Sequence, residues 1–208
     1  MTFSRLGLFA ITASALALSG CISLLPKTKP AELYRFGYFA APAPGAADRK
    51  AETPIFRATG AFQRGSASDR LLTITGDQAA YIAGTRWIAP ATVLWDEALV
   101  AAFDADPGPT RLVSRGEPAR SDYLLRLDVR TFEARYDRGA KAAPVVVVRV
   151  RGAMLRNKDQ SLVGERIFEA QARASENRVS AIVPAYSRAV AEVLKDIVGW
   201  TNAAVTAG

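Results

Sequence analysis

Three long strand-like runs in the second half of the chain constrain its fold more than any other feature. In residues 123–130 an apolar side chain occupies every second position, which is the period of a strand with one face on a core. The apolar set then moves to Phe132, Ala134 and Tyr136, and this change of phase predicts a β-bulge near Thr131.

Two further strands follow this first run. Residues 145–155 open with four consecutive valines, which predicts that both faces are buried there. Residues 157–160 make a polar turn, and residues 162–174 return as the next strand. Three strands joined by short polar loops predict an antiparallel meander.

A long amphipathic helix is predicted after the meander. Apolar residues recur every three or four positions from Ile182 to Ala204, which indicates a helix that lies on a sheet. We expect Ser180 to cap this helix and its first turn to tolerate Pro184.

The first half carries shorter signals. A helix is expected from Pro90 to about Asp104, with Thr92 as its cap and Val93 on its apolar face. Four short strands are expected before this helix, over residues 33–38, 55–64, 71–75 and 79–83. Between the first two lies an Ala/Pro/Gly-rich segment, residues 40–51, which is expected to be a loop. Together these patterns predict one domain of mixed α/β (α+β) class over residues 31–208. Its mixed, largely antiparallel sheet ends in the meander and is packed by two main helices.

The opening segment has the form of a bacterial export signal. Arg5 precedes roughly a dozen apolar residues, well short of the ~20 that a transmembrane helix needs. The residues Leu18, Ser19, Gly20 and Cys21 then resemble the lipobox of bacterial lipoproteins, in which small residues fit a protease cleft and the cysteine receives lipid. The alternative is a buried helix with an incidental cysteine.

Cleavage before Cys21 would remove residues 1–20 as a signal peptide and leave a lipidated tether over residues 21–30. The lipoprotein pattern implies several acyl chains on Cys21, which hold a protein at a membrane far more firmly than one myristoyl chain does. The residue after the cysteine is Ile22. In the enterobacterial sorting pattern an aspartate at this position would keep a lipoprotein in the inner membrane, so Ile22 resembles the pattern of lipoproteins that are sent to the outer membrane.

The residue types that the sequence lacks exclude most catalytic chemistry. The chain has no histidine, so it can form neither a Ser-His-Asp triad nor a histidine metal ligand, and its one cysteine is assigned to lipid. It also has no glycine-rich phosphate loop. We therefore predict no catalytic residue, no metal and no cofactor. Three carboxylate pairs remain, and we expect none of them to be catalytic: Asp96 with Glu97, Asp104 with Asp106, and Glu165 with Glu169. The first two lie on the predicted helix or at its end, where solvated charges are normal, and the third lies on a strand whose charged face, with Arg149 and Arg151, is expected to be solvated.

The charge balance bears on the partners. The formal net charge of +7 favours anionic lipid head groups or an acidic partner surface, and export argues against nucleic acid. The sequence leaves a homo-oligomer open.

Several of these features together resemble a known family. They are the lipobox, the early Tyr34-Arg35-Phe36, the run from Tyr81 to Trp87 before a helix, and the final strands and helix. In this combination the chain resembles the auxiliary lipoprotein component of ABC-type transport systems, the PqiC-like family. The resemblance implies a mixed α/β domain without enzymatic activity, anchored in the outer membrane and facing the periplasm. It also implies an MCE-domain protein and an ABC permease–ATPase pair as partners in moving lipids between membranes.

A second function stays open beside this one. A lipoprotein of this class can carry a lipid, with an acyl chain held in its own cavity between sheet and helices. An enzyme ranks third because the usual catalytic groups are missing.

The Arg86-Trp87 corner, where a strand gives way to a helix, is the candidate partner contact. An arginine beside a rigid aromatic is typical of binding hot spots, so we expect Arg86 and Trp87 to form a partner surface or to position it. The alternative is that Trp87 packs inward. Trp200 is expected in the core, and Trp95 is ambiguous.

The lipobox generates the first testable prediction. Replacing Cys21 with serine should prevent lipid attachment and release the protein from the membrane fraction, because a hydroxyl does not replace the thiol. Metabolic labelling with a tagged fatty acid, followed by membrane fractionation, measures both effects. A Cys21→Ser variant that still takes up label would refute the assignment.

Overall fold

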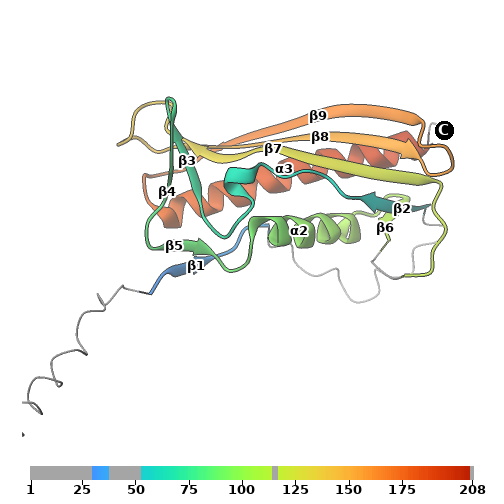
Figure 1. Ribbon diagram of the computed structural model, residues 1–208, viewed down its shortest axis with the longest axis horizontal. Coiled ribbons are helices and arrows are strands. Elements are labelled where there is room, and N and C mark those ends of the chain that lie inside the picture. The colour runs from blue at the N-terminus through green and yellow to red at the C-terminus, as the bar shows by residue number, and fades with distance from the viewer. Residues whose placement is uncertain (1–29, 38–52, 114–116, 207–208) are drawn as a thin grey trace, which may run out of the picture. The chain divides into compact units, whose positions relative to one another are not determined.

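The computed structural model describes residues 30–37, 53–113 and 117–206 of the chain (Figure 1). Its elements are, in chain order, β1 (Glu32–Tyr34), β2 (Thr53–Ala58), the short 3-10 helix η1 (Arg64–Ser66), β3 (Leu72–Thr75), β4 (Gln78–Tyr81), β5 (Thr85–Trp87), α2 (Ala91–Ala105), β6 (Thr110–Leu112), β7 (Tyr123–Arg135), β8 (Val145–Arg156), β9 (Leu162–Arg173) and α3 (Val179–Thr206). The predicted mixed α/β class is confirmed.

The strand β7 organises the larger, seven-stranded sheet. One of its edges pairs antiparallel with β8, which in turn pairs antiparallel with β9, so the predicted meander is confirmed. The other edge is shared, because β2 pairs in parallel with the start of β7 and β3 pairs in parallel with its end. β6 extends the sheet beyond β2, and β4 extends it beyond β3. A separate two-stranded sheet pairs β1 in parallel with β5.

A bulge divides β7 at the predicted place. The register against β8 shifts between Val129 and Thr131. Leu127 and Val129 are buried before the shift, and Phe132 and Ala134 are buried after it. The extra residue therefore keeps both halves of the strand facing one core even though their side chains are out of phase.

An irregular segment closes the middle of the shared edge of β7. The Val129 N–H donates to the Ala61 carbonyl at 2.8 Å, and the Gln63 N–H donates to the Val129 carbonyl at 2.8 Å. A Cβ added at Gly60 would lie 1.8 Å from the Leu127 carbonyl oxygen, so only glycine lets the backbone pass this close to β7.

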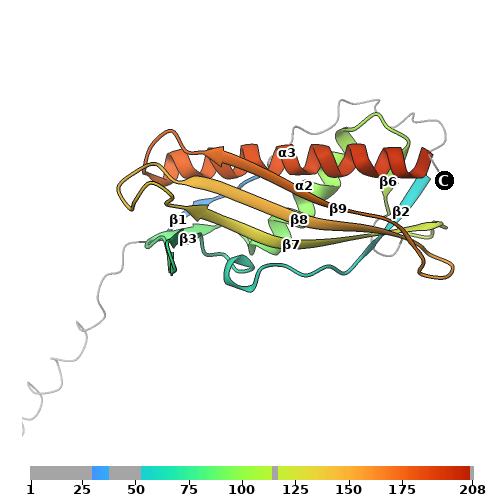
Figure 2. The same cartoon turned by 90° about the horizontal axis from the view of Figure 1, so that it is seen from above.

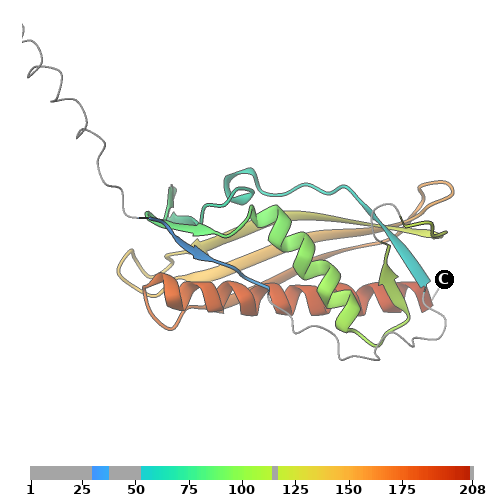
Figure 3. The same cartoon turned by 90° about the horizontal axis from the view of Figure 1, so that it is seen from below.

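Both long helices lie on the same face of the larger sheet (Figures 2 and 3). α3 packs along β8 and β9, and it also contacts α2. Its apolar stripe is buried as the spacing predicts, from Ile182 and Tyr186 to Val193 and Ile197. Trp200 is half-buried, and its ring meets the Phe168 ring edge-on at 5.6 Å between centroids.

The starts of both helices differ from expectation. Pro90 occupies the N-cap of α2 and makes no side-chain hydrogen bond there, so Thr92 is not the cap. α3 already begins at Val179, which places Ser180 in its first turn and Pro184 in the helix interior. In both cases tertiary packing extends the helix beyond the capping residue that local preference favours.

The inner face of α2 also differs from the predicted one. Val93 is 43% exposed, because the helix is rotated so that its large rings enter the core. The residues buried on the helix are Ala91, Leu94, Trp95, Ala98, Leu99 and Phe103.

The short strands are the least well predicted part of the fold. β1 is confined to Glu32–Tyr34 and β2 ends at Ala58, whereas the sequence predicted longer strands, and β6 was not predicted. The loop expected over residues 40–51 lies outside the described residues. The short strands predicted at 71–75 and 79–83 are present as β3 and β4, which pair antiparallel as a hairpin, and Gly76 makes its turn with φ +57°.

The helix-on-sheet packing generates a stability prediction. Ile197 on α3 is 0% exposed, so Ile197→Ala should leave a cavity and lower the free energy of unfolding by about 2–5 kcal/mol. Chemical denaturation measures the loss. Lys195→Ala, at an exposed position of the same helix, is the control and should stay within about 0.5 kcal/mol of the parent. An equal loss in both variants would contradict the packing described.

Candidate functional site

The Arg86-Trp87 corner is the end of β5, where this strand pairs with β1. Alternation along β5 buries Thr85 and Trp87 and turns Arg86 outward. The Trp87 N–H donates to the Asp69 carbonyl at 2.7 Å, which fixes the strand against the loop before β3. The two neighbouring residues therefore face opposite environments.

Trp87 is a core residue. It is 2% exposed, and its ring meets the rings of Phe36 and Tyr186 edge-on, at 4.9 and 5.2 Å between centroids. Of the two readings that the sequence left open, inward packing is the one observed, and a direct contact through an exposed Trp87 is wrong. The reason is tertiary, because Tyr186 comes from α3 and lies about a hundred residues away in the sequence.

Arg86 lies at the surface beside two exposed aliphatic residues. Its Nη1 donates to both carboxylate oxygens of Asp69, at 2.8 and 2.9 Å. Leu33 is its partner in the β1–β5 register, and Ile88 continues that pairing through its N–H to the Tyr34 carbonyl at 2.7 Å. Leu33 and Ile88 are 60% and 61% exposed. We call Leu33, Arg86 and Ile88 the outer face.

A cavity of about 350 Å³ lies between α2, β6 and β7, closed on one side by residues 58–62. Most of the side chains that line it are apolar, polar atoms supply nearly half of the exposed wall, and the charged residues in the lining are Arg57 and Asp96. The Arg57 Nη2 donates to the Asp96 carboxylate at 3.0 Å. The Arg57 Nη1 is buried and has no hydrogen-bond partner among the described residues, which is rare for a buried donor.

The carboxylate pairs weighed for catalysis are held by other groups. Asp96 pairs with Arg57 and Glu97 with Arg35 on one side of the molecule, and Asp106 accepts hydrogen bonds from the Gly108 N–H and the Asn202 side chain. Each of these three carboxylates is thus already bound by a neighbouring group of the protein.

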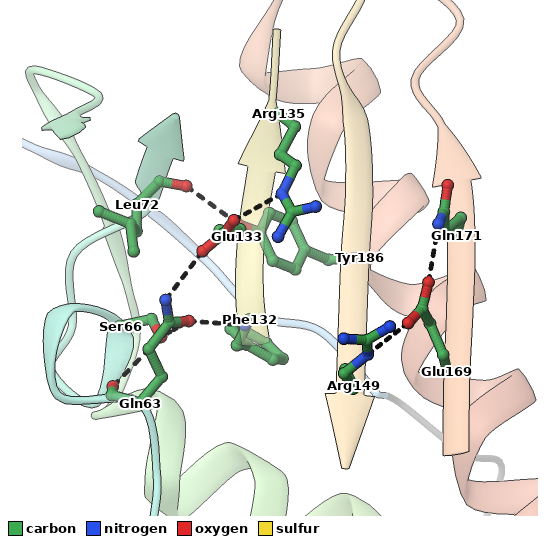
Figure 4. A network of polar contacts seen from close by, with 10 residues as sticks. All are labelled: Gln63, Ser66, Leu72, Phe132, Glu133, Arg135, Arg149, Glu169, Gln171 and Tyr186. Carbon is green, nitrogen blue, oxygen red and sulfur yellow. Dashed lines mark hydrogen bonds and ion pairs between the residues drawn. The ribbon is translucent and has the colours of Figure 1, made fainter. Parts of the chain in front are cut away.

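The third pair lies on β9, opposite arginines of β8. Arg151 binds Glu165 through two hydrogen bonds, and these lower the pKa of Glu165. Hydrogen bonds from Gln171 and Arg149 lower the pKa of Glu169 (Figure 4). The expectation of a solvated charged strand face fits this ladder of ion pairs.

A buried polar network that the sequence did not reveal supports the core beside Trp87. The side chain of Gln63 accepts from the Phe132 N–H at 2.7 Å and donates to Glu133 at 2.8 Å, while Arg135 donates to Glu133 at 2.7 Å (Figure 4). Burial raises the pKa of Tyr186, whose hydroxyl donates to the Leu72 carbonyl. The sequence around Glu133 does not indicate that this residue is buried, because the segment that contains Gln63 covers it only in the folded protein.

Over residues 30–37, 53–113 and 117–206, no group of acidic, histidine or cysteine side chains is arranged to hold a metal ion. Within the same described parts of the chain, every helix is too short or too polar to cross a bilayer.

The sequence model of one protein family matches residues 67–198, well over half of the chain. That family is the ABC-type transport auxiliary lipoprotein component. The chain belongs to this family. The resemblance drawn from its motifs is therefore confirmed, and an auxiliary role in ABC-type transport follows for the chain.

Solved structures share the fold of this auxiliary component. The crystal structure of a Xanthomonas campestris protein assigned to the DUF330 family model is 26% identical, with a TM-score of 0.70, over 85% of this chain and 98% of that one. A hypothetical protein from Chlamydia trachomatis is 12% identical, with a TM-score of 0.52, over 76% of this chain and 100% of that one, and it shows the fold alone. No curated protein sequence matches this chain.

The residues predicted to form the lipobox of this family member are not among those that the structure describes. Leu18, Ser19, Gly20 and Cys21 all fall outside the described ranges, so the anchor stays a prediction.

The opposite environments of Arg86 and Trp87 generate a prediction about the corner. Trp87→Ala should lower the free energy of unfolding by about 3–5 kcal/mol, because it empties the centre of an aromatic cluster. Arg86→Ala should change it by about 1 kcal/mol or less, because its ion pair with Asp69 is half-exposed. Thermal and denaturant unfolding of the two single variants would reveal the difference, and similar losses would be inconsistent with it.

Proposed function

We propose that this chain is a non-enzymatic docking component of an ABC/MCE-type lipid transport system. It is held in the outer membrane by lipid on Cys21 and faces the periplasm. The observation that carries the proposal is the family match over residues 67–198. The lipobox supports the lipid anchor, and Ile22 after the cysteine supports the outer membrane as its location.

The anchor restricts where the domain can act. Glu32, the first residue of β1, follows Cys21 by eleven residues, which span at most ~36 Å at about 3.3 Å each. The outer face begins with the next residue, Leu33. A lipid on Cys21 therefore keeps this face close to the membrane surface, where a partner that bridges the two membranes must arrive.

The outer face suits a protein partner. It offers two exposed aliphatic side chains around an arginine, and hot spots of protein interfaces favour arginine set in apolar surroundings. The partner we propose is the periplasmic part of an MCE-domain protein, which connects to the ABC permease and ATPase. Arg86 makes the contact, and the buried Trp87 holds the strand that presents it.

A lipid carrier is the second candidate, and the cavity beside Arg57 is the observation that favours it. Its volume of about 350 Å³ lies at the low end of the 300–1,000 Å³ that small-molecule sites occupy. A site of this size suits one chain rather than a two-chain phospholipid. We therefore rank docking above carriage of the transported lipid.

The docking role is tested by capture of the purified full chain on an immobilised MCE-domain partner. Arg86→Ala should weaken capture about thirtyfold, corresponding to the ~2 kcal/mol of a hot-spot arginine. Arg149→Ala is the matched control, because it removes an exposed arginine that also has a carboxylate partner, and it should bind as the parent does.

Two outcomes would count against this assignment. A folded Arg86→Ala variant with the parent's affinity would remove the outer face from the interface. A parent chain that the partner does not retain at all would overturn the docking role itself.

A further inference from the structure

We propose that the cavity between α2 and β7 binds a single-chain amphiphile with an anionic head group, which the Arg57 guanidinium holds. The proposal concerns a different surface from the outer face. It stands independently of the docking role, and it gives the ligand chemistry of the second candidate function.

The cavity exists because the edge of β7 is closed there by an irregular segment. Residues 59–61 pass β7 at the close approach that Gly60 permits, and β2 has already ended at Ala58. α2 lies across the opening and contributes Trp95, Leu99 and Val100 to the wall. Among the residues that the structure describes, the side chains of these two layers leave this space unfilled.

The walls favour a hydrocarbon chain. Leu127 and Val129 of β7 and Leu99 of α2 are almost fully buried and line the space, with Phe62 at its side. A lining of mostly apolar side chains with polar groups at particular points is typical of sites that hold an apolar ligand and orient it by its head group. At about 350 Å³ the space accommodates one chain.

Arg57 supplies the point of recognition. Its Nη2 donates to Asp96 at 3.0 Å, whereas the buried Nη1 has no acceptor within the described part of the chain. In the proposed complex the guanidinium turns about its bond to Asp96, so that Nη1 leaves its buried position and faces the cavity. A carboxylate or a phosphate monoester is the acceptor that a guanidinium binds most strongly, so either head group would complete the site.

Asp96 makes the direction of the expected change in ligand affinity testable. Its carboxylate is half-exposed and competes with an anionic ligand for the same guanidinium. Removal of the Asp96 charge should therefore strengthen binding, while removal of the Arg57 charge should weaken it. A water-filled gap beside a structural ion pair would show neither change.

The experiment uses the full chain in phosphatidylcholine nanodiscs and a laurate probe with a photoreactive diazirine near the end of its chain. After irradiation, mass spectrometry of peptides locates the label, which should lie on α2 or on residues 127–129 of β7. Unlabelled laurate and dodecyl phosphate should suppress labelling at concentrations at least tenfold below dodecanol or acetate. Stronger competition by laurate indicates a fatty acid, and stronger competition by dodecyl phosphate indicates a single-chain lipid with a phosphate monoester head group.

Four variants decide the outcome. Arg57→Gln should reduce labelling at least tenfold, and Asp96→Asn should increase it severalfold. Val100→Trp, at a partly exposed position of the wall, should block labelling without disturbing the fold. Arg149→Gln, on β8, is the control and should label as the parent does.

Several results would overturn the proposal. They are label outside the cavity, equal competition by dodecanol or by acetate, or labelling that Arg57→Gln and Asp96→Asn leave unchanged. If Arg57→Gln does not fold, the rise with Asp96→Asn and the block with Val100→Trp decide the matter. Capture of the Arg57→Gln variant on the MCE-domain partner is measured in parallel, so failure of this site and failure of the docking role are distinguishable.

Discussion

Four aromatic rings hold the parts of this domain together. Phe36, Trp87, Phe132 and Tyr186 come from the chain after β1, from β5, from β7 and from α3, and neighbouring centroids lie between 4.9 and 5.2 Å apart. Each such pair contributes about 0.5–1.5 kcal/mol beyond the burial of its surface. Because the cluster joins both sheets to the long helix, it also decides that Arg86 points outward.

The shared edge of β7 creates the second functional feature. A regular strand along this edge would leave no space beneath α2, whereas the two short strands β2 and β3, which residues 59–71 connect, leave a gap. The close passage at Gly60 and the bonds of Ala61 and Gln63 to Val129 keep that gap narrow and fixed in shape. The outer face and the cavity are thus both consequences of how short segments complete a framework of long ones.

The framework itself could be predicted from the sequence, because its signals are local and repeated. The alternation over residues 123–130, its change of phase before Phe132 and the four valines from Val145 specify strands, a bulge and a doubly buried stretch whatever their partners are. The spacing from Ile182 onward specifies the buried face of α3 in the same way. Family membership could also be inferred from the motifs. The absence of histidine from the sequence excluded a Ser-His-Asp triad and histidine metal ligands.

Only the tertiary structure decided the sites. β1, β5 and β6 are three residues each, too short to show a period, so they become strands only through the hydrogen bonds of their partners. The burial of Trp87 depends on rings that α3 and β7 bring from elsewhere in the chain. That the Arg57 Nη1 finds no acceptor among the described residues depends on where α2 crosses the sheet. A sequence specifies which side chains alternate or recur, but burial and pairing between distant segments are properties of the assembled core.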